Sequence, residues 1–246
     1  VLRDELLTAF PNSVFNGQGR HYTEEGLIEF FDGADGVVVG LEAITDSVLA
    51  ACPKLKIVSK YGVGLDNVDQ AACANRRVHI GWDGGVNRRG VAEMTVCFMI
   101  GLSRNIFFSA RGLRVKKDWS KHGGADLSGR TVGIIGAGHI GKEVIGLLEP
   151  FGCEILVNDI IDQTAYYETM GVKETSKEDI YRNADIISVH TPLDGSTCGM
   201  VNERVFKSMK DVAYFINVAR GAIADQKALK SALENGQIAG AAIDVF

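Results

Sequence analysis

The segment Thr131-Val-Gly-Ile-Ile-Gly-Ala-Gly-His-Ile-Gly141 joins an apolar, β-branched run to the pattern Gly136-x-Gly138-x-x-Gly141. A strand, glycines at this spacing and then a helix are typical of dinucleotide-binding α/β domains. The first glycine permits a tight turn, the second lets a pyrophosphate approach the backbone, and the third lets the helix pack against the sheet. Free N–H groups and the dipole at the helix start also favour negative charge. The segment therefore predicts a dinucleotide site at Gly136, Gly138 and Gly141.

A second apolar run, Ile155-Leu-Val157, leads to Asp159, 23 residues after Gly136. An acid at the end of the second strand is where such sites hold the adenosine ribose hydroxyls. A glycine-rich turn without a ligand is the alternative interpretation of the pattern. The strand before it, the helix after it and the acid together favour a bound cofactor.

The composition indicates an ordinary globular α/β protein and excludes several other classes. The chain has 246 residues, 46% of them hydrophobic, and a net charge of −5 with acidic and basic residues interspersed. That length suits two domains or one large unit. No basic face is available for nucleic acid, no polybasic anchor or apolar run of membrane-spanning length is present, and no signal peptide is recognised. We expect neither nucleic acid nor a membrane as a partner.

Five cysteines occur far apart, and none forms a C-x-x-C pair. An odd number with this spacing favours reduced thiols in a cytoplasmic protein and argues against zinc. Each thiol is expected to be buried as a small apolar side chain, and no metal site is expected.

The arrangement of apolar runs predicts two doubly wound α/β domains, over residues 1–90 and 91–246. In the first, β-rich runs at 36–40, 55–59 and 78–80 alternate with helical patterns at 45–51 and 67–75. Apolar positions from Asn87 to Arg111 follow a helical period and predict one long helix between the domains. In the second, strands are expected at 131–135, 155–158, 186–189, 214–218 and 241–246, and helices at 140–149, 177–182, 202–207 and 226–235.

Three polar groups fall at the carboxyl ends of the later strands, where ligands of open α/β sheets bind. They are His190-Thr-Pro-Leu193, Ala219-Arg220-Gly221 and Asp244, the last within the final predicted strand. Taken singly, these are a loop histidine, a surface cation and a turn acid. Three at corresponding strand ends favour a functional site.

In these motifs the chain resembles the D-isomer-specific 2-hydroxyacid dehydrogenase family, nearly end to end. The resemblance rests on order and spacing, including 24 residues from Arg220 to Asp244. The segments that carry it are Tyr61–Asp69, Val91-Ala-Glu93, Leu127–Gly136, His190–Leu193, Met209-Lys210, Ile216–Gly221 and Ala241–Phe246. It implies a flavodoxin-like substrate domain, a Rossmann NAD-binding domain, and NAD in the cleft between them.

The resemblance also implies roles for individual residues. Gly62, Val63 and Gly64 would offer N–H groups to a substrate carboxylate, and Arg220 would grip that carboxylate and the carbonyl oxygen as a planar cation. Asp244 would hold the nicotinamide carboxamide. His190 and Pro192 would line the cofactor cleft without acting as acid or base. Further cofactor contacts are implied for His139, Ile140, Thr191, Thr197, Val218 and Ala219.

The implied reaction is reversible hydride transfer between nicotinamide and C2 of a 2-hydroxy or 2-keto acid. Asp159 is followed by Ile160 and Ile161, with no arginine to meet a 2′-phosphate, which favours NAD over NADP. The family's general acid is a histidine held by a glutamate, and both follow the Asp244-Val-Phe246 strand. The chain begins without methionine and stops at Phe246 in an apolar run, so both ends are expected to be cut and these two residues are missing.

One segment departs from the family pattern. Trp82-Asp-Gly-Gly-Val-Asn-Arg-Arg89 stands where the family has Asn-x-Pro before the shared Asn87. Arg88 and Arg89 place two cations near a helix start, where the dipole does not favour them. They either recognise an anionic substrate or are a solvated pair, and the solvated pair is the simpler interpretation.

Two other functions are compatible with the same fold. The chain could belong to an NAD-responsive regulator of the corepressor type, or to a formate or phosphite dehydrogenase. The resemblance also implies a homodimer or homotetramer formed through the long helix and its neighbours.

Overall fold

The computed structural model describes residues 2–246, which divide into two compact units. Unit 1 ends at Trp82 and unit 2 begins at Asp83. The break lies eight residues before the domain boundary that the sequence suggests at 90/91. The helix that begins at Arg88 therefore lies wholly in unit 2.

Unit 1 is a small parallel α/β unit. Its strands β1 (Gly36–Val39), β2 (Ile57–Lys60) and β3 (His79–Gly81) form a sheet in the order β1-β2-β3. The helices are α1 (Leu2–Ala9), α2 (Glu24–Phe30), α3 (Asp46–Ala51) and α4 (Gln70–Arg76). Side chains of Thr23, Thr45 and Asp69 accept backbone N–H groups at the starts of α2, α3 and α4, as good N-caps do. The predicted strand–helix alternation is confirmed, whereas α1 and α2 were not predicted.

Unit 2 contains the six-stranded parallel sheet of a Rossmann fold. The strand order is β6-β5-β4-β7-β8-β9, so the chain winds outward from β4 in one direction and then from β7 in the other. The strands are β4 (Thr131–Ile135), β5 (Glu154–Asn158), β6 (Lys173–Glu174), β7 (Ile186–Val189), β8 (Tyr214–Asn217) and β9 (Gly240–Ile243). The expected parallel α/β class is confirmed, and the reversal of winding occurs in this sheet.

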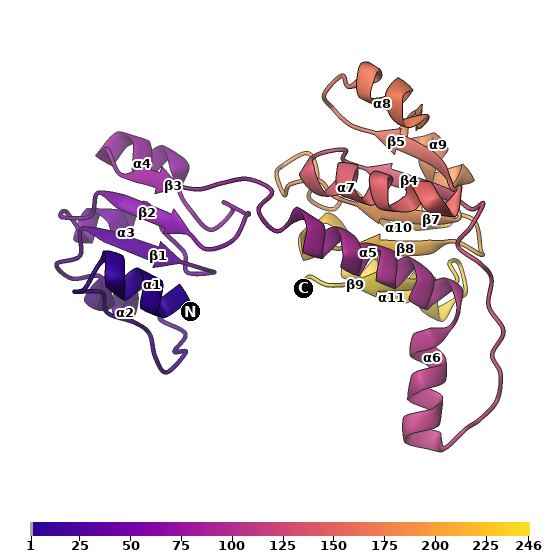
Figure 1. Cartoon of the computed structure of the whole chain (residues 1–246), viewed down its shortest axis with the longest axis horizontal. Helices are drawn as coiled ribbons and strands as arrows, with labels where there is room; N and C mark the ends of the chain where they lie inside the picture. Colours follow the sequence, from indigo (N-terminus) through magenta and orange to yellow (C-terminus); the bar gives the residue numbers. More distant parts are fainter. Residues whose placement is uncertain (1) are drawn as a thin grey trace. The chain divides into compact units, whose positions relative to one another are not determined.

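Helices cover both faces of the larger sheet (Figure 1). One apolar core brings together α5 (Arg88–Ser103), α7 (His139–Leu148) and α8 (Thr164–Met170), with Met99 and Leu148 fully buried. The other core contains α9 (Lys177–Asn183), α10 (Glu203–Ser208) and α11 (Gln226–Glu234), with Phe206 packed edge-on against Phe215. Burial on both faces explains why the inner strands read as continuous apolar runs.

The single long helix predicted from Asn87 to Arg111 is wrong. The structure has α5, then α6 (Ile106–Arg111) and a π-helical turn η1 (Gly112–Lys116), and the two parts are bent by 73°. Asn105 adopts a left-handed conformation (φ 54°) at the break, and its amide donates to the carbonyl of His122. Gly101 lets the Phe107 ring fold back, because a Cβ there would lie 2.3 Å from it. Figure 1 shows α6 projecting away from the sheet.

All five cysteines are free thiols, as expected, but they are not all buried. Cys52 and Cys73 are buried and Cys153 is intermediate, whereas Cys97 and Cys198 are exposed. The expectation of burial is therefore wrong for Cys97 and Cys198. Cys97 lies on the outer side of α5, where the helical period alone does not show how much of the helix is covered.

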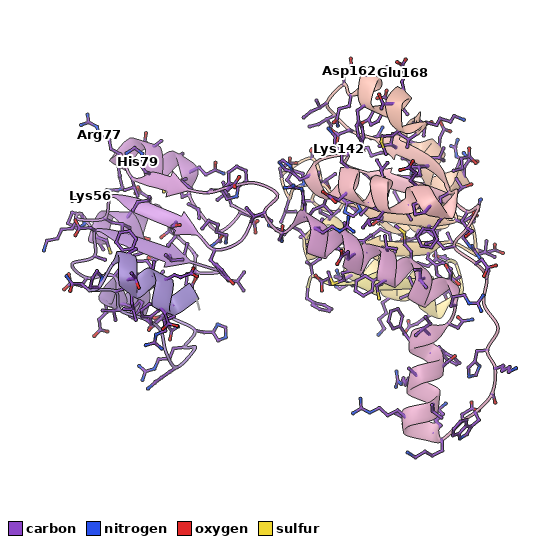
Figure 2. The ribbon with its side chains drawn as sticks, viewed as in Figure 1. Lys56, Arg77, His79, Lys142, Asp162 and Glu168 are labelled. Carbon is purple, nitrogen blue, oxygen red and sulfur yellow. The ribbon has the colours of Figure 1, made fainter. Side chains whose placement is uncertain are left out.

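Within residues 2–246, no single helix has the length and apolarity needed to cross a membrane, although the bent pair of α5 with α6–η1 meets those criteria jointly. No group of three or more histidine, cysteine or acidic side chains in that range could hold a metal ion. Figure 2 shows the side chains; His79 is exposed on β3 beside Lys56 and Arg77, and Lys142 lies on α7.

Candidate cofactor site

The glycine pattern forms the turn between β4 and α7, and each glycine has a different reason to lack a side chain. Gly136 has φ 96°, and a Cβ there would lie 2.9 Å from the carbonyl group of His190. A Cβ on Gly141 would lie 2.1 Å from the carbonyl oxygen of Gly136. A Cβ on Gly138 would meet no protein atom within 4 Å, so the backbone there is open to a ligand. The turn therefore has the three properties expected of a pyrophosphate cradle.

The start of α7 offers free donors beside that open position. No side chain caps this helix, and the N–H groups of Gly138, His139 and Ile140 donate no hydrogen bond to the part of the chain that is described. Because uncapped N–H groups and the helix dipole both attract anions, this end of α7 suits a diphosphate.

Asp159 lies just after β5 and faces the glycine turn. Its carboxylate accepts the N–H of Ala137 at 2.6 Å and the N–H of Ile161 at 3.0 Å. The two bonds orient the carboxylate, and each oxygen retains lone pairs for further donors. Ile160 and Ile161 beyond it are exposed. The arrangement matches a carboxylate that accepts ribose hydroxyls.

The end of β7 contains two buried polar atoms without a partner. The Nε2 atom of His190 lies 2.9 Å from the hydroxyl of the fully buried Ser188, whereas His190 Nδ1 and Thr191 Oγ1 have no hydrogen-bond partner. Burial lowers the pKa of His190 to about 4, so the ring is neutral near pH 7. Buried polar atoms normally have partners, so two orphans beside Gly136 indicate a place that a polar ligand completes. The residues present therefore fit a dinucleotide.

The loop after His190 is held by its own side chains. Thr197 Oγ1 donates to the carbonyl of Pro192 at 2.7 Å and accepts the N–H of Asp194 at 2.8 Å. The Thr197 hydroxyl, predicted from the resemblance to contact the cofactor, is thus used to shape the loop that presents Thr191 and Pro192.

Arg220 and its neighbours follow β8 at the same edge of the sheet. Val218 and Ala219 are buried, and Arg220 is half-buried in an extended conformation. Its Nη1 donates to the carbonyl of Ala219 at 2.7 Å. Asn217 is completely buried beneath this loop and bonds to it twice, a feature that the sequence analysis missed. A polar residue that ends an apolar strand could have revealed it.

Asp244 is placed next to the same loop by β-pairing. The final strand β9 ends at Ile243, so the prediction that Asp244 lies within it is wrong. The N–H of Asp244 donates to the carbonyl of Asn217 at 3.1 Å, and the side chain is exposed. Asp159, His190, Arg220 and Asp244 thus follow β5, β7, β8 and β9 at one edge of one sheet, as the sequence analysis expected.

The loop Gly62–Gly64 belongs to unit 1. Gly62 has φ 130°, and the carbonyl of Val63 accepts the indole N–H of Trp82 at 2.9 Å. Within the described chain, the N–H groups of Gly62, Val63 and Gly64 have no acceptor. Three free donors in succession are compatible with the carboxylate-binding role predicted for this loop, which stays a prediction.

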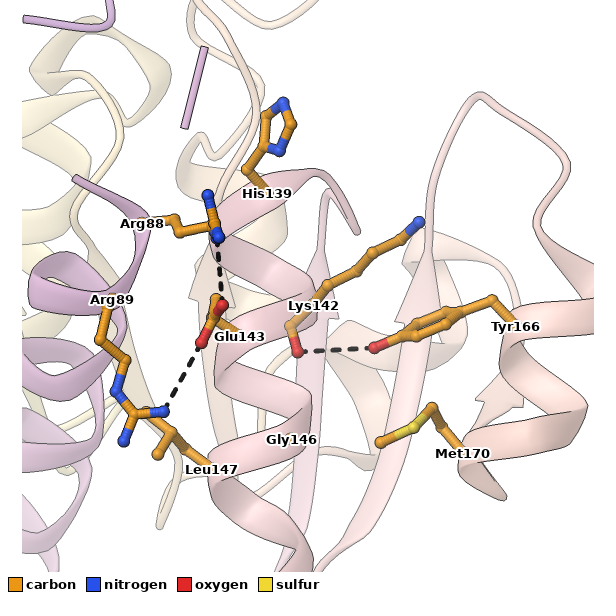
Figure 3. Close-up of a pocket in the computed structure, with 9 residues that line it drawn as sticks. All are labelled: Arg88, Arg89, His139, Lys142, Glu143, Gly146, Leu147, Tyr166 and Met170. Atoms are coloured by element: carbon orange, nitrogen blue, oxygen red, sulfur yellow. Dashed lines mark hydrogen bonds and ion pairs between the residues drawn. The ribbon is translucent and has the colours of Figure 1, made fainter. Parts of the chain in front are cut away.

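Arg88 and Arg89 line a cleft of about 540 Å³ on the outer side of α7 (Figure 3). Glu143 lies between them, 3.1 Å from Arg88 Nε and 3.6 Å from Arg89 Nη1, and Arg89 also pairs with Glu93 at 2.7 Å. These contacts connect the first turn of α5 to α7. Both arginines are thus engaged in ion pairs within unit 2 while remaining at least half exposed. This favours a solvated pair of arginines over recognition of an anionic substrate.

The fold and the site define a dinucleotide-binding α/β protein, and comparison with known proteins specifies the family. The model of the D-isomer specific 2-hydroxyacid dehydrogenase NAD-binding domain matches residues 96–246. The chain is 35% identical over 229 residues to D-3-phosphoglycerate dehydrogenase of Rattus norvegicus, covering 92% of this chain and 43% of the rat protein. The chain thus spans less than half the length of that relative.

Two solved structures show the same similarity in three dimensions. A formate dehydrogenase of Granulicella matches with a TM-score of 0.83 and 29% identity, over 89% of this chain and 60% of its own. D-lactate dehydrogenase from Escherichia coli matches with a TM-score of 0.83 and 26% identity, over 98% and 77%. The chain belongs to the D-isomer specific 2-hydroxyacid dehydrogenase family, as its motifs indicated.

Proposed function

We propose that this chain is part of an NAD-dependent dehydrogenase that interconverts a D-2-hydroxy acid and its 2-keto acid. The observation that carries the proposal is the position of Arg220 at the edge of the sheet that also contains the glycine turn and Asp159. A permanent cation beside a dinucleotide cradle suits an anionic substrate. The relatives named above are dehydrogenases, and no observation on residues 2–246 favours a regulator on this fold.

The proposal gives the side chains of unit 2 separate tasks. The glycine turn and the start of α7 bind the diphosphate, Asp159 accepts the ribose hydroxyls, and Asp244 orients the carboxamide. Arg220 binds the substrate carboxylate and stabilises the negative charge that grows on the C2 oxygen during reduction. The bound nicotinamide supplies or accepts the hydride.

Proton transfer is assigned to residues other than His190. Its ring is hydrogen-bonded to Ser188, and burial lowers its pKa to about 4, so near pH 7 it is a neutral imidazole and not the imidazolium that a general acid requires. The family resemblance instead assigns the proton to a histidine beyond Asp244-Val-Phe246. Activity is therefore tested in the full-length protein.

The cofactor preference and the substrate class are also proposals. Asp159 would repel a 2′-phosphate, and Ile160 and Ile161 offer it no cation, which supports NAD over NADP. The relatives are named for phosphoglycerate, formate and lactate, so the substrate is proposed only as a small 2-hydroxy or 2-keto acid.

We propose a homodimer or homotetramer assembled through α6 and its neighbours. The segment α6–η1 and the chain after it expose Phe108 (64%), Val115 (68%) and Trp119 (85%) to solvent. So much exposed aromatic and aliphatic surface on a projecting segment is typical of a contact with another chain. Phe108→Asp should lower the mass measured by light scattering to that of a monomer. An unchanged mass would place the contact elsewhere.

The catalytic proposal is tested with a panel of 2-keto acids and NADH, with formate and NAD as a separate arm. Full-length wild-type protein should oxidise NADH with at least one keto acid. Arg220→Ala should lose at least ~100-fold in kcat/KM while NADH affinity changes little. Turnover of formate alone, or full activity of Arg220→Ala, would contradict the proposal.

A further inference from the structure

The geometry points to Asn217 as a positioning residue: its side chain shapes the turn that presents Arg220 to the substrate, and its backbone carbonyl anchors Asp244. This inference rests on the proposed function. Asn217 is the last residue of β8, and its side chain has no exposed surface. Its neighbours in the strand, Phe215 and Ile216, are apolar and also fully buried. A buried amide among apolar side chains is tolerated only where it is hydrogen-bonded.

Both ends of the Asn217 amide bond to the loop that follows it. The Oδ1 atom accepts the N–H of Ala219 at 3.1 Å, and Nδ2 donates to the carbonyl of Arg220 at 2.8 Å. The side chain therefore closes the backbone of residues 217–220 into one compact turn. Neither bond involves solvent-exposed atoms of Asn217, so water does not replace them readily.

This compact turn also supports the guanidinium of Arg220. Ala219 is held by its N–H to Asn217, and its carbonyl accepts Arg220 Nη1 at 2.7 Å. The backbone carbonyl of Arg220 accepts Asn217 Nδ2, and its guanidinium is held by the Ala219 carbonyl. A change in the turn therefore moves the Cα atom from which the Arg220 side chain extends. Asn217 thus acts on the substrate through Arg220 without touching it.

Asn217 also connects this turn to Asp244. Its backbone carbonyl accepts the N–H of Asp244 at 3.1 Å, and it is paired with Ile243 in the parallel register of β8 and β9. One residue is therefore bonded both to the turn that carries the cation assigned to the substrate and to the backbone of the acid assigned to the carboxamide. Effective hydride transfer depends on the alignment of these two groups, since an error of about 1 Å can reduce a rate ~100-fold.

The geometry explains why few residues could replace asparagine here. Leucine would fill the space but leave the Ala219 N–H and the Arg220 carbonyl without partners. Aspartate would accept the N–H but face the Arg220 carbonyl with a buried negative charge. Serine could accept the Ala219 N–H, yet its hydroxyl is too short to serve both groups.

The test compares Asn217→Ala and the milder Asn217→Ser with wild type in the full-length protein. The probes are NADH alone, and oxamate, an unreactive keto acid analogue, at saturating NADH. We expect Asn217→Ala to lower the affinity for oxamate at least ~30-fold and kcat/KM by a similar factor. Its affinity for NADH should stay within about threefold of wild type. Asn217→Ser should lose less, since it can retain the bond to Ala219.

Two further measurements separate positioning from general destabilisation. Hydrogen exchange of the Ala219 amide should accelerate in Asn217→Ala. The control is Thr95→Ala on α5, which removes another fully buried polar side chain whose hydroxyl donates to the Val91 carbonyl at 2.8 Å. It should lower the melting temperature without changing oxamate affinity or Ala219 exchange.

The inference is overturned if Asn217→Ala keeps the Ala219 amide protected, or if its loss of oxamate affinity is matched by Thr95→Ala. Failure of the wild-type protein to bind oxamate or reduce any keto acid would instead refute the dehydrogenase proposal. In that case Ala219 exchange alone decides whether Asn217 holds the turn.

Discussion

Three glycines of the β4–α7 turn allow a prediction that separates folding from binding. In Gly141→Ala the new Cβ would lie 2.1 Å from the Gly136 carbonyl oxygen, whereas a carbon and a carbonyl oxygen normally approach to about 3.3 Å. One of the two backbones must therefore move by about 1 Å. Overpacking of this kind costs up to about 3 kcal/mol, and the better helix propensity of alanine returns about 1 kcal/mol.

The expected net loss in Gly141→Ala is about 2 kcal/mol, which corresponds to a fall in melting temperature of about 4–8 °C for a unit of this size. Because the displaced carbonyl belongs to the cradle, NAD affinity should fall as well. Gly138→Ala should behave differently, since its Cβ meets no protein atom within 4 Å. Its stability should stay within about 0.5 kcal/mol of wild type, while NAD binds at least ~10-fold more weakly.

The control is Gly146→Ala in the same helix, where the Cβ also meets nothing within 4 Å. It should be as stable as wild type or more so, by up to about 1 kcal/mol, with unchanged NAD affinity. Thermal unfolding and calorimetric titration with NAD measure both quantities. Equal melting temperatures for Gly141→Ala and Gly146→Ala, or wild-type NAD affinity in Gly138→Ala, would refute the reasoning.

Three further predictions concern charges of unit 2. Asp159→Ala should lower the affinity for NAD by ~10-fold or more and the affinity for NADP by less. Equal losses of affinity for the two cofactors in a titration would show that the carboxylate does not contact the ribose. Burial lowers the pKa of His190 from 6.5 to about 4, so the folded protein does not take up a proton that the unfolded chain binds in that range. Its contribution to stability is complete above pH 6.5 and is lost as the pH falls toward 4. His190→Gln should make the free energy of unfolding, measured by urea denaturation, depend less on pH between 6.5 and 4. A pH dependence identical to that of wild type would contradict the lowered pKa of His190. Glu143→Gln should cost about 0.5–1 kcal/mol at low ionic strength and less in high salt, because both arginine partners are half exposed or more; a loss independent of salt would argue against the ion pairs.

The sequence predicted the parts of this fold that depend on local pattern. The glycine turn, the acid after β5 and the polar residues after β7 and β8 all follow buried apolar strands, whose periodicity is plain. It did not predict the break in the long helix, because Arg104 and Asn105 interrupt neither the apolar period nor the charge pattern. The break depends on the left-handed Asn105 and on Phe107 packing over Gly101, which are tertiary contacts.

The same division applies to the site. Residue type and strand position were enough to select Asp159, Arg220 and Asp244, since ligands of open α/β sheets bind at the carboxyl ends of the strands, where charged side chains can contact them. Ser188 and Asn217 escaped attention because each stands in an apolar strand, and only the packed structure shows that they are completely buried and hydrogen-bonded. Likewise, the ion pairs of Arg88 and Arg89 with Glu143 become visible only when the structure places α5 beside α7.

By itself, the sequence determined the α/β class, the dinucleotide cradle and the family, because these depend on glycine spacing and on strands that must be apolar to be buried. The tertiary structure alone decided how the cradle is completed. Parallel pairing brings the ends of β5, β7, β8 and β9 to one edge, and hydrogen bonds from Ala137, Ser188 and Asn217 orient the side chains there. The bond from Ala137 joins residues 22 apart in the chain, whereas Ser188 and Asn217 bond to near neighbours, and only the packed sheet shows that those two side chains are buried.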